Sequence, residues 1–174
     1  MGSGKEYNFP ADTNTNTNTN TNTSKGAPVS RLSPNAPCPC GSGLKYKKCC
    51  RPYHQGKVAP DPLTLMKSRY SAYAAGEAAY IQRTTHPEHP DWSEDRESWR
   101  REILAFSRGT EFLGLEIRSH RQEGAEGWVH FIARLSSGPM EECSHFLLRE
   151  GRWLYHQALP PGECTAAPSR DGSG

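Results

Sequence analysis

Residues 36–53 read Ala-Pro-Cys-Pro-Cys-Gly-Ser-Gly-Leu-Lys-Tyr-Lys-Lys-Cys-Cys-Arg-Pro-Tyr. Two pairs of cysteines in this stretch are separated by one short loop, in which two glycines permit a tight turn. Zn²⁺ prefers four soft ligands in a tetrahedron, and four thiolates satisfy it. The stretch therefore predicts a structural zinc site with the ligands Cys38, Cys40, Cys49 and Cys50.

Two other interpretations of these cysteines are a disulfide pair and a redox-active dithiol. Adjacent cysteines such as Cys49 and Cys50 bridge poorly to each other. The spacing also differs from the Cys-x-x-Cys pattern of generic zinc fingers. His54 follows closely and is a rival ligand, although four thiolates already fill a tetrahedral shell.

The charges around the cysteines carry a second message, because residues 38–53 contain four cations and no acid. Four thiolates on one Zn²⁺ carry a net charge of −2, so the cations leave a surplus of +2. They either only neutralise the thiolates or also form a basic face for an anionic partner. The face that we predict consists of Lys45, Tyr46, Lys47, Lys48 and Arg51.

The rest of the chain is not basic. Residues 54–174 hold 14 cations against 17 acids, and the whole chain has a formal net charge of +2. A broad nucleic-acid-binding surface is therefore not expected, and nucleic acid is expected only as part of a ribosome-like partner.

The composition also divides the chain. Residues 13–23 alternate strictly between threonine and asparagine, so residues 1–36 are expected to be disordered. The tail from 161 to 174 is expected to be flexible. No apolar run is long enough for a membrane span or a signal peptide, which favours a cytoplasmic protein with reduced thiols.

Helical patterns precede strand patterns in the body. Asp61 is expected to cap a helix that ends at Gly76, a second helix spans 77–84, and Ser93 is expected to cap a third. From residue 111 the period changes to two. The residues expected to face inward are Leu113, Leu115, Ile117, Val129, Phe131, Ala133, Leu135, Glu142, Ser144, Phe146 and Leu148. Helices followed by an antiparallel meander indicate an α+β fold.

The cysteine segment resembles the SEC-C motif, which is named after the C-terminal zinc tail of the SecA translocase motor. That tail docks on the SecB chaperone and has been linked to phospholipid and ribosome contact. The resemblance implies Zn²⁺ as cofactor, bound at 37–54. It also implies a protein partner such as a SecB-like chaperone, a ribosome or lipid head groups.

The resemblance continues in segments at 65–73, 84–87, 111–117, 131–134 and 152–155, which are similar to the YchJ-like family. It implies that residues 55–160 form a cystatin-like, nuclear transport factor 2-like (NTF2-like) cone, with helices packed on a curved antiparallel sheet. Three departures stand out. Only Cys164 stands near the place where many members carry a second SEC-C motif, the family's Thr-Trp-His-Pro reads Thr-Thr-His-Pro at 84–87, and Gln157-Ala158 replaces an Asp-Gly pair.

Cones of this type often enclose a cavity, and some are enzymes. The residues that could line it are Arg69, Tyr70, Tyr73, His86, Glu111, Arg134, Glu142 and His145. Glu142 is expected to point into the cone and to pair with Arg69. The alternative to an active site in the cavity is that this is a satisfied buried ion pair among core tyrosines. No catalytic residues at a diagnostic spacing are present, and Cys143 and Cys164 receive no role. The pattern favours a zinc-binding interaction protein over an enzyme or small-molecule binder that uses the cavity.

Overall fold

The computed structural model describes residues 32–164, and the statements below concern these residues. The helical elements are η1 (Tyr46–Lys48), α1 (Arg51–His54), α2 (Pro62–Ala75), α3 (Ala78–Arg83), α4 (Arg96–Gly109) and η2 (Pro161–Cys164). The strands are β1 (Phe112–Glu123), β2 (Glu126–Leu135), β3 (Gly138–Arg149) and β4 (Arg152–Leu159). The four α-helices precede the strands, as the change of period from 3.6 to 2 predicts, and only the short turn η2 follows them.

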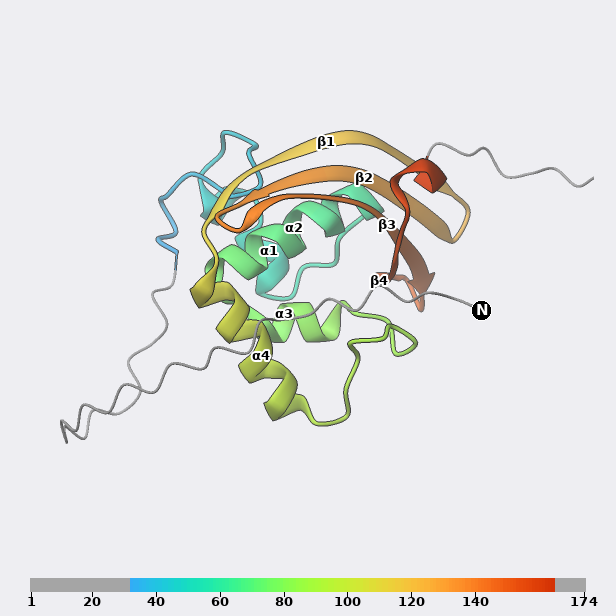
Figure 1. The fold of residues 1–174 in the computed structure, drawn as a ribbon, viewed down its shortest axis with the longest axis horizontal. Coiled ribbons are helices and arrows are strands. Elements are labelled where there is room, and N and C mark those ends of the chain that lie inside the picture. Colours follow the sequence, from blue (N-terminus) through green and yellow to red (C-terminus); the bar gives the residue numbers. More distant parts are fainter. Residues whose placement is uncertain (1–31, 165–174) are drawn as a thin grey trace, which may run out of the picture.

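The strands form one antiparallel meander in the order β1-β2-β3-β4. Figure 1 shows that the sheet curves over α2 and that α3 and α4 lie on the far side of α2. The α+β class is thereby confirmed. The core between sheet and helices contains Leu65, Met66, Trp99, Ile103, Val129, Phe131, Phe146 and Trp153.

Helix α2 is buried on every side rather than along one stripe. Nine of its 14 residues are buried, among them the polar Ser68, Arg69 and Ser71. The sheet covers one side of the helix, and the cysteine loop covers another, where Ala75 packs against the cysteines. The sheet and the cysteine loop are therefore both positioned by their packing against α2.

The helix ends follow the predicted caps with one exception. The backbone N–H of Thr64 donates to Oδ1 of Asp61 at 2.7 Å, and Gly76 ends α2 with φ of +72°. The assignment of Ser93 as the cap of α4 is wrong. Asp95 caps this helix by accepting from the backbone N–H of Ser98, and the Ser93 hydroxyl accepts from that of Asp95.

The inward positions of β2 are confirmed, since all four are at most 8% exposed. On β1 the prediction for Leu113 is wrong, because its side chain is 64% exposed. Phe112 pairs with Leu135 and Gly114 with Arg134, so Leu113 is the extra residue of a bulge. The bulge reverses the strand's alternation, and Phe112 packs on the core instead.

The two ends of the described chain belong to the fold. Cys143 on β3 and Cys164 on η2 form a disulfide. Residues 161–164 are therefore fixed to the sheet and do not belong to a flexible tail. The backbone oxygen of Ala36 accepts from Tyr46, which places residues 32–36 with the cysteine loop rather than in a disordered arm. The Thr-Asn repeat and residues 165–174 lie outside the described residues. Within 32–164, no helix combines the length and apolar character needed to cross a lipid bilayer.

The contact between β2 and α2 leaves no room for a side chain at Gly127. A Cβ added there would lie 2.7 Å from Cβ of Pro62 and closer still to Cγ, in a rigid ring at the start of α2. We expect Gly127→Ala to lower the free energy of unfolding by about 1–3 kcal/mol, through overpacking.

The matched control is Gly114→Ala in β1, where the nearest atom is a flexible arginine Cδ at 3.9 Å. Urea unfolding of both variants measures the difference. Equal stability of Gly127→Ala and Gly114→Ala would contradict the close approach of α2 to β2.

Candidate metal centre

A hairpin-like loop positions the first cysteine pair. The backbone N–H of Cys38 donates to the Leu44 oxygen at 2.8 Å, and that of Tyr46 donates to the Ala36 oxygen at 2.8 Å. Gly41 and Gly43 turn the chain between these bonds with φ of +78° and +77°, a region that favours glycine. The 3₁₀ turn η1 then brings the second pair back across the loop.

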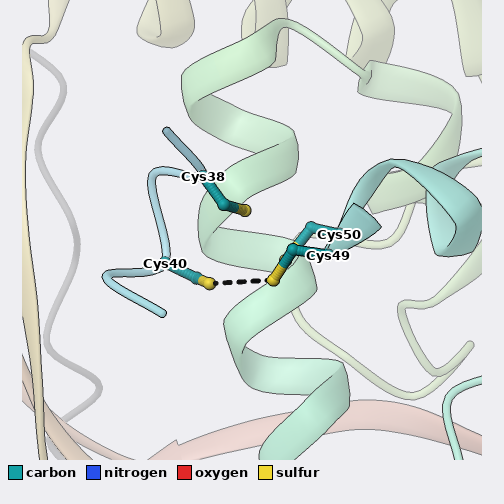
Figure 2. A group of neighbouring side chains, drawn as sticks. All are labelled: Cys38, Cys40, Cys49 and Cys50. Carbon is teal, nitrogen blue, oxygen red and sulfur yellow. Dashed lines mark hydrogen bonds between the residues drawn. The ribbon is translucent and has the colours of Figure 1, made fainter. Parts of the chain in front are cut away.

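The four sulfurs meet at the side of α2. Figure 2 shows Cys38 and Cys40 on one strand of the loop, facing Cys49 and Cys50. Sγ of Cys49 lies 3.5 Å from Sγ of Cys40 and 3.9 Å from Sγ of Cys50, and all four sulfurs lie within 4.8 Å of one another. A tetrahedron with metal–sulfur bonds of about 2.3 Å needs sulfurs about 3.8 Å apart. The four cysteines therefore fit a tetrathiolate metal site.

Crowding shifts the pKa values of three of these thiols in different directions. Burial raises the pKa of Cys49 to about 11. The contact with Cys38 raises the pKa of Cys50 and lowers that of Cys40, because one thiol donates its proton to stabilise its neighbour as a thiolate. Four thiolates side by side need a divalent cation between them, so metal binding must be coupled to release of these protons.

Two hydroxyl groups contact the sulfurs from outside. Oγ of Ser42 lies 3.1 Å from Sγ of Cys49, and Oγ of Ser71 lies 3.5 Å from Sγ of Cys38. A hydroxyl can donate a hydrogen bond to a thiolate and fix its direction. Ser42 belongs to the motif itself, but Ser71 lies on α2, 33 residues after Cys38, and no local pattern in the sequence points to it.

A buried hydrogen-bond chain ties the loop to the cone. Nε2 of His54 lies 2.8 Å from the backbone oxygen of Ser68, so this nitrogen donates. Nδ1 of His54 therefore accepts from the hydroxyl of Tyr46, at 2.6 Å. Both ring nitrogens are thus engaged, and burial lowers the pKa of His54, which keeps the ring neutral. His54 is a structural residue rather than a rival ligand.

The hydrogen bonds from Tyr46 to His54 and from His54 to Ser68 also correct the predicted basic face. Tyr46 is only 3% exposed, because its ring packs under the cysteine loop, so it cannot contact a partner directly. Lys45, Lys47 and Lys48 are exposed, and none of them forms an ion pair with another described residue. Arg51 is half-buried beside a hollow of about 320 Å³ that Glu77 also lines.

The predicted lining of the cone is only partly assembled. Oε1 of Glu142 accepts from the hydroxyls of Ser144 at 2.6 Å and Tyr155 at 2.8 Å. The predicted direct pair between Arg69 and Glu142 is wrong. The Arg69 guanidinium lies over the ring of Tyr155 at 4.8 Å and donates to Ile81 O and to the hydroxyls of Thr84 and Thr85. Tyr155 separates the two charges.

The remaining predicted residues are scattered. The hydroxyl of Tyr70 donates to the backbone oxygen of Gly114, and Tyr73 packs edge-on against Phe106. Glu111 and Arg134 are exposed. His86 and His145 gather instead around His156, near the β4 edge of the sheet. The hydrogen bonds of Arg69, Tyr70 and Glu142 go to separate backbone oxygens and hydroxyls, and no nucleophile–base pair is formed by the predicted set.

Two family models match the cysteine loop and the cone separately. The SEC-C motif matches residues 35–52, and the model described as "YchJ, middle NTF2-like domain" matches residues 61–158. The chain belongs to the YchJ-like family. Both resemblances seen in the sequence are therefore confirmed, including the NTF2-like class of the cone.

Solved structures support the assignment. A SEC-C motif protein from Rhodopseudomonas palustris is 34% identical, with a TM-score of 0.60 over 71% of this chain and 98% of that one. A SEC-C motif protein from Psychrobacter arcticus is 26% identical, with a TM-score of 0.58 over 69% of this chain and 80% of that one.

The bond between Tyr46 and His54 should stabilise the fold measurably. In Tyr46→Phe, Nδ1 of the buried His54 loses its donor, and an unsatisfied buried acceptor costs about 1–3 kcal/mol. We expect that loss in urea unfolding of the metal-loaded protein, with the metal content unchanged. Tyr53→Phe is the control, because no hydrogen bond joins the half-buried Tyr53 hydroxyl to a described residue. Equal stability of the two variants would contradict the structural role of the chain.

Proposed function

We propose that this protein is a zinc-binding interaction protein whose SEC-C loop docks on an anionic protein surface. Zinc is the ion that suits the site best, since four thiolates in a closed tetrahedron are typical of structural Zn²⁺. Three of the four cysteines are at most 5% exposed, which leaves no open position for a substrate. The metal would shape the loop rather than perform chemistry.

The observation that carries the docking proposal is the free positive charge on the loop. Lys45, Lys47 and Lys48 surround the cysteines, are exposed and lack acidic partners among the described residues. Leu44, which is 53% exposed, adds an apolar side chain beside them. A partner with carboxylates around a small apolar pocket would complement this surface. An acidic chaperone face has that chemistry, whereas a ribosome or a lipid surface would offer phosphates.

The metal assignment predicts that loss of two cysteine ligands removes one zinc ion per chain. We expect elemental analysis after dialysis to find one zinc fewer in the Cys49→Ser/Cys50→Ser variant than in the natural chain, because two of four ligands are lost. Cys143→Ser/Cys164→Ser is the control and should keep its zinc, since this pair forms the disulfide. Equal zinc in the first variant and the natural chain would rule out the cysteine site.

The docking proposal predicts that charge reversal weakens association without loss of zinc. Lys47→Glu leaves every metal ligand in place. We expect it to reduce several-fold the amount of partner protein that becomes cross-linked to the chain in extracts of the source cells. The remaining binding should fall with salt, because exposed charges are screened over about 10 Å at 0.1 M. Arg101→Glu, which makes the same charge change at an exposed site on α4, should bind normally.

Purified ribosomes and phosphatidylglycerol vesicles form separate arms of this experiment. Loss of ribosome or vesicle binding in Lys47→Glu, with protein capture unchanged, would replace the acidic protein by a phosphate-bearing surface. Unchanged capture in every arm, with full zinc, would leave the lysines as charge compensation for the thiolates.

A further inference from the structure

A second group of metal-binding side chains lies near the β4 edge of the sheet. It consists of His86 and Glu88, in the loop after α3, and His156 on β4. Their donor atoms all lie within 4.8 Å of one another. His86 is buried and the side chain of His156 is 19% exposed, whereas that of Glu88 is 67% exposed and free to adjust.

The backbone holds the two histidines side by side. The N–H of His86 donates to the backbone oxygen of Tyr155 at 2.8 Å, and the N–H of Tyr155 donates to that of Thr84 at 2.8 Å. On the other side of β4, Phe146 pairs with Tyr155 and His145 with Gln157, so His156 is the extra residue of a bulge. Bulges re-aim side chains, and here the ring of His156 meets that of His86 edge-on at 5.1 Å.

A chain of hydrogen bonds orients His156 from behind. Nε2 of His145 lies 3.1 Å from Oε2 of Glu126, so this nitrogen carries the proton and donates it. Nδ1 of His145 is then the acceptor for Nδ1–H of His156, at 3.2 Å. The ring of Trp128 stacks on His145 at 5.1 Å and holds it in place. In this arrangement Nε2 of a neutral His156 presents a lone pair.

That lone pair faces another acceptor. Nε2 of His156 lies 3.5 Å from Oε2 of Glu88. Nδ1 of His86 lies 3.8 Å from the same carboxylate oxygen and accepts from the backbone N–H of Glu88 at 3.2 Å, a hydrogen bond that a metal ion at this nitrogen would replace. Three electron-pair donors thus converge on one small volume, which is favourable when a cation lies between them.

We propose that His86, Glu88 and His156 bind an exchangeable divalent transition-metal ion, with His145 and Glu126 as positioning residues for His156. Two imidazoles and one carboxylate suit Zn²⁺, Co²⁺ or Ni²⁺ better than Mg²⁺ or Ca²⁺, which prefer oxygen ligands alone. Three protein ligands leave at least one coordination position open for water or a small anionic ligand. The site therefore differs in kind from the closed tetrathiolate.

The probe is Co²⁺, titrated by calorimetry into tag-free protein whose cysteine site already holds zinc. We expect one Co²⁺ to bind per chain without the near-ultraviolet sulfur-to-cobalt charge-transfer band that a thiolate site would give. His156→Gln and Glu88→Gln should each weaken binding at least about 100-fold. His145→Gln should weaken it about 10–100-fold, the usual effect of losing the partner of a ligating histidine.

The control is His120→Gln, at an exposed histidine on β1 outside the group, and it should bind Co²⁺ as the natural chain does. Glu88→Gln also controls for folding, because this exposed side chain can be changed without disturbing the core. No uptake at millimolar Co²⁺, equal uptake by His156→Gln, or uptake seen only with the thiolate band would overturn the proposal. In that case the group is a set of ion pairs between Glu88 and protonated histidines.

Discussion

The burial of α2 on all sides is the constraint on which the rest of the structure depends. An amphipathic helix on a sheet normally leaves one face in water. Here the second face carries Ser68 and Ser71, both fully buried; the cysteine loop contacts Ser71, and His54 and Tyr80 contact Ser68. Ser68 takes part in three hydrogen bonds. Its carbonyl accepts from His54, and its hydroxyl bonds to the Leu65 oxygen and the Tyr80 hydroxyl. Small polar residues at these positions let the loop approach closely while the hydroxyls of Ser68 and Ser71 both keep partners.

This arrangement changes the relation between the two parts of the chain. A short SEC-C segment by itself suggests a separate knob that folds around its metal and leaves the cone unaffected. The guanidinium of Arg83 donates to the backbone oxygens of Tyr53 and His54, and the ring of His54 packs on Tyr80 at 4.8 Å. Metal-binding energy is folding energy in such sites. Through these contacts a metal ion bound by the cysteines would also support α2 and α3, so the contacts favour coupling of the two parts over modularity.

Sequence patterns predicted most of the fold because the deciding features are local. The cap at Asp61, the glycine stop at Gly76 and the alternation of β2 are each set within a few residues. The errors occur where a bulge or a distant partner decides. Leu113 faces outward because of a bulge that periodicity alone does not reveal. Tyr46 is buried because its partner, His54, bonds to α2.

The same distinction separates the parts of the site. The stretch 36–53 predicts the cluster of its four cysteines, since the spacing and the ligand type are both visible. Ser71 is beyond the reach of such reasoning, as is the pairing of Cys143 with Cys164 across 21 residues. The separation of Arg69 from Glu142 by Tyr155 also depends on three elements, α2, β3 and β4, meeting in space.

The chain contains both free thiols and a disulfide, and the two differ in what they require of their surroundings. Six cysteines include four free thiols in the loop and one disulfide between β3 and η2. An environment that maintains a disulfide also threatens exposed thiolates, and Cys49 is the least buried of the four. A bound metal ion removes that conflict, because a coordinated thiolate has its lone pairs engaged and its neighbours fixed. The tetrathiolate and the disulfide can then coexist in one chain, and the prediction of uniformly reduced thiols is wrong for Cys143 and Cys164.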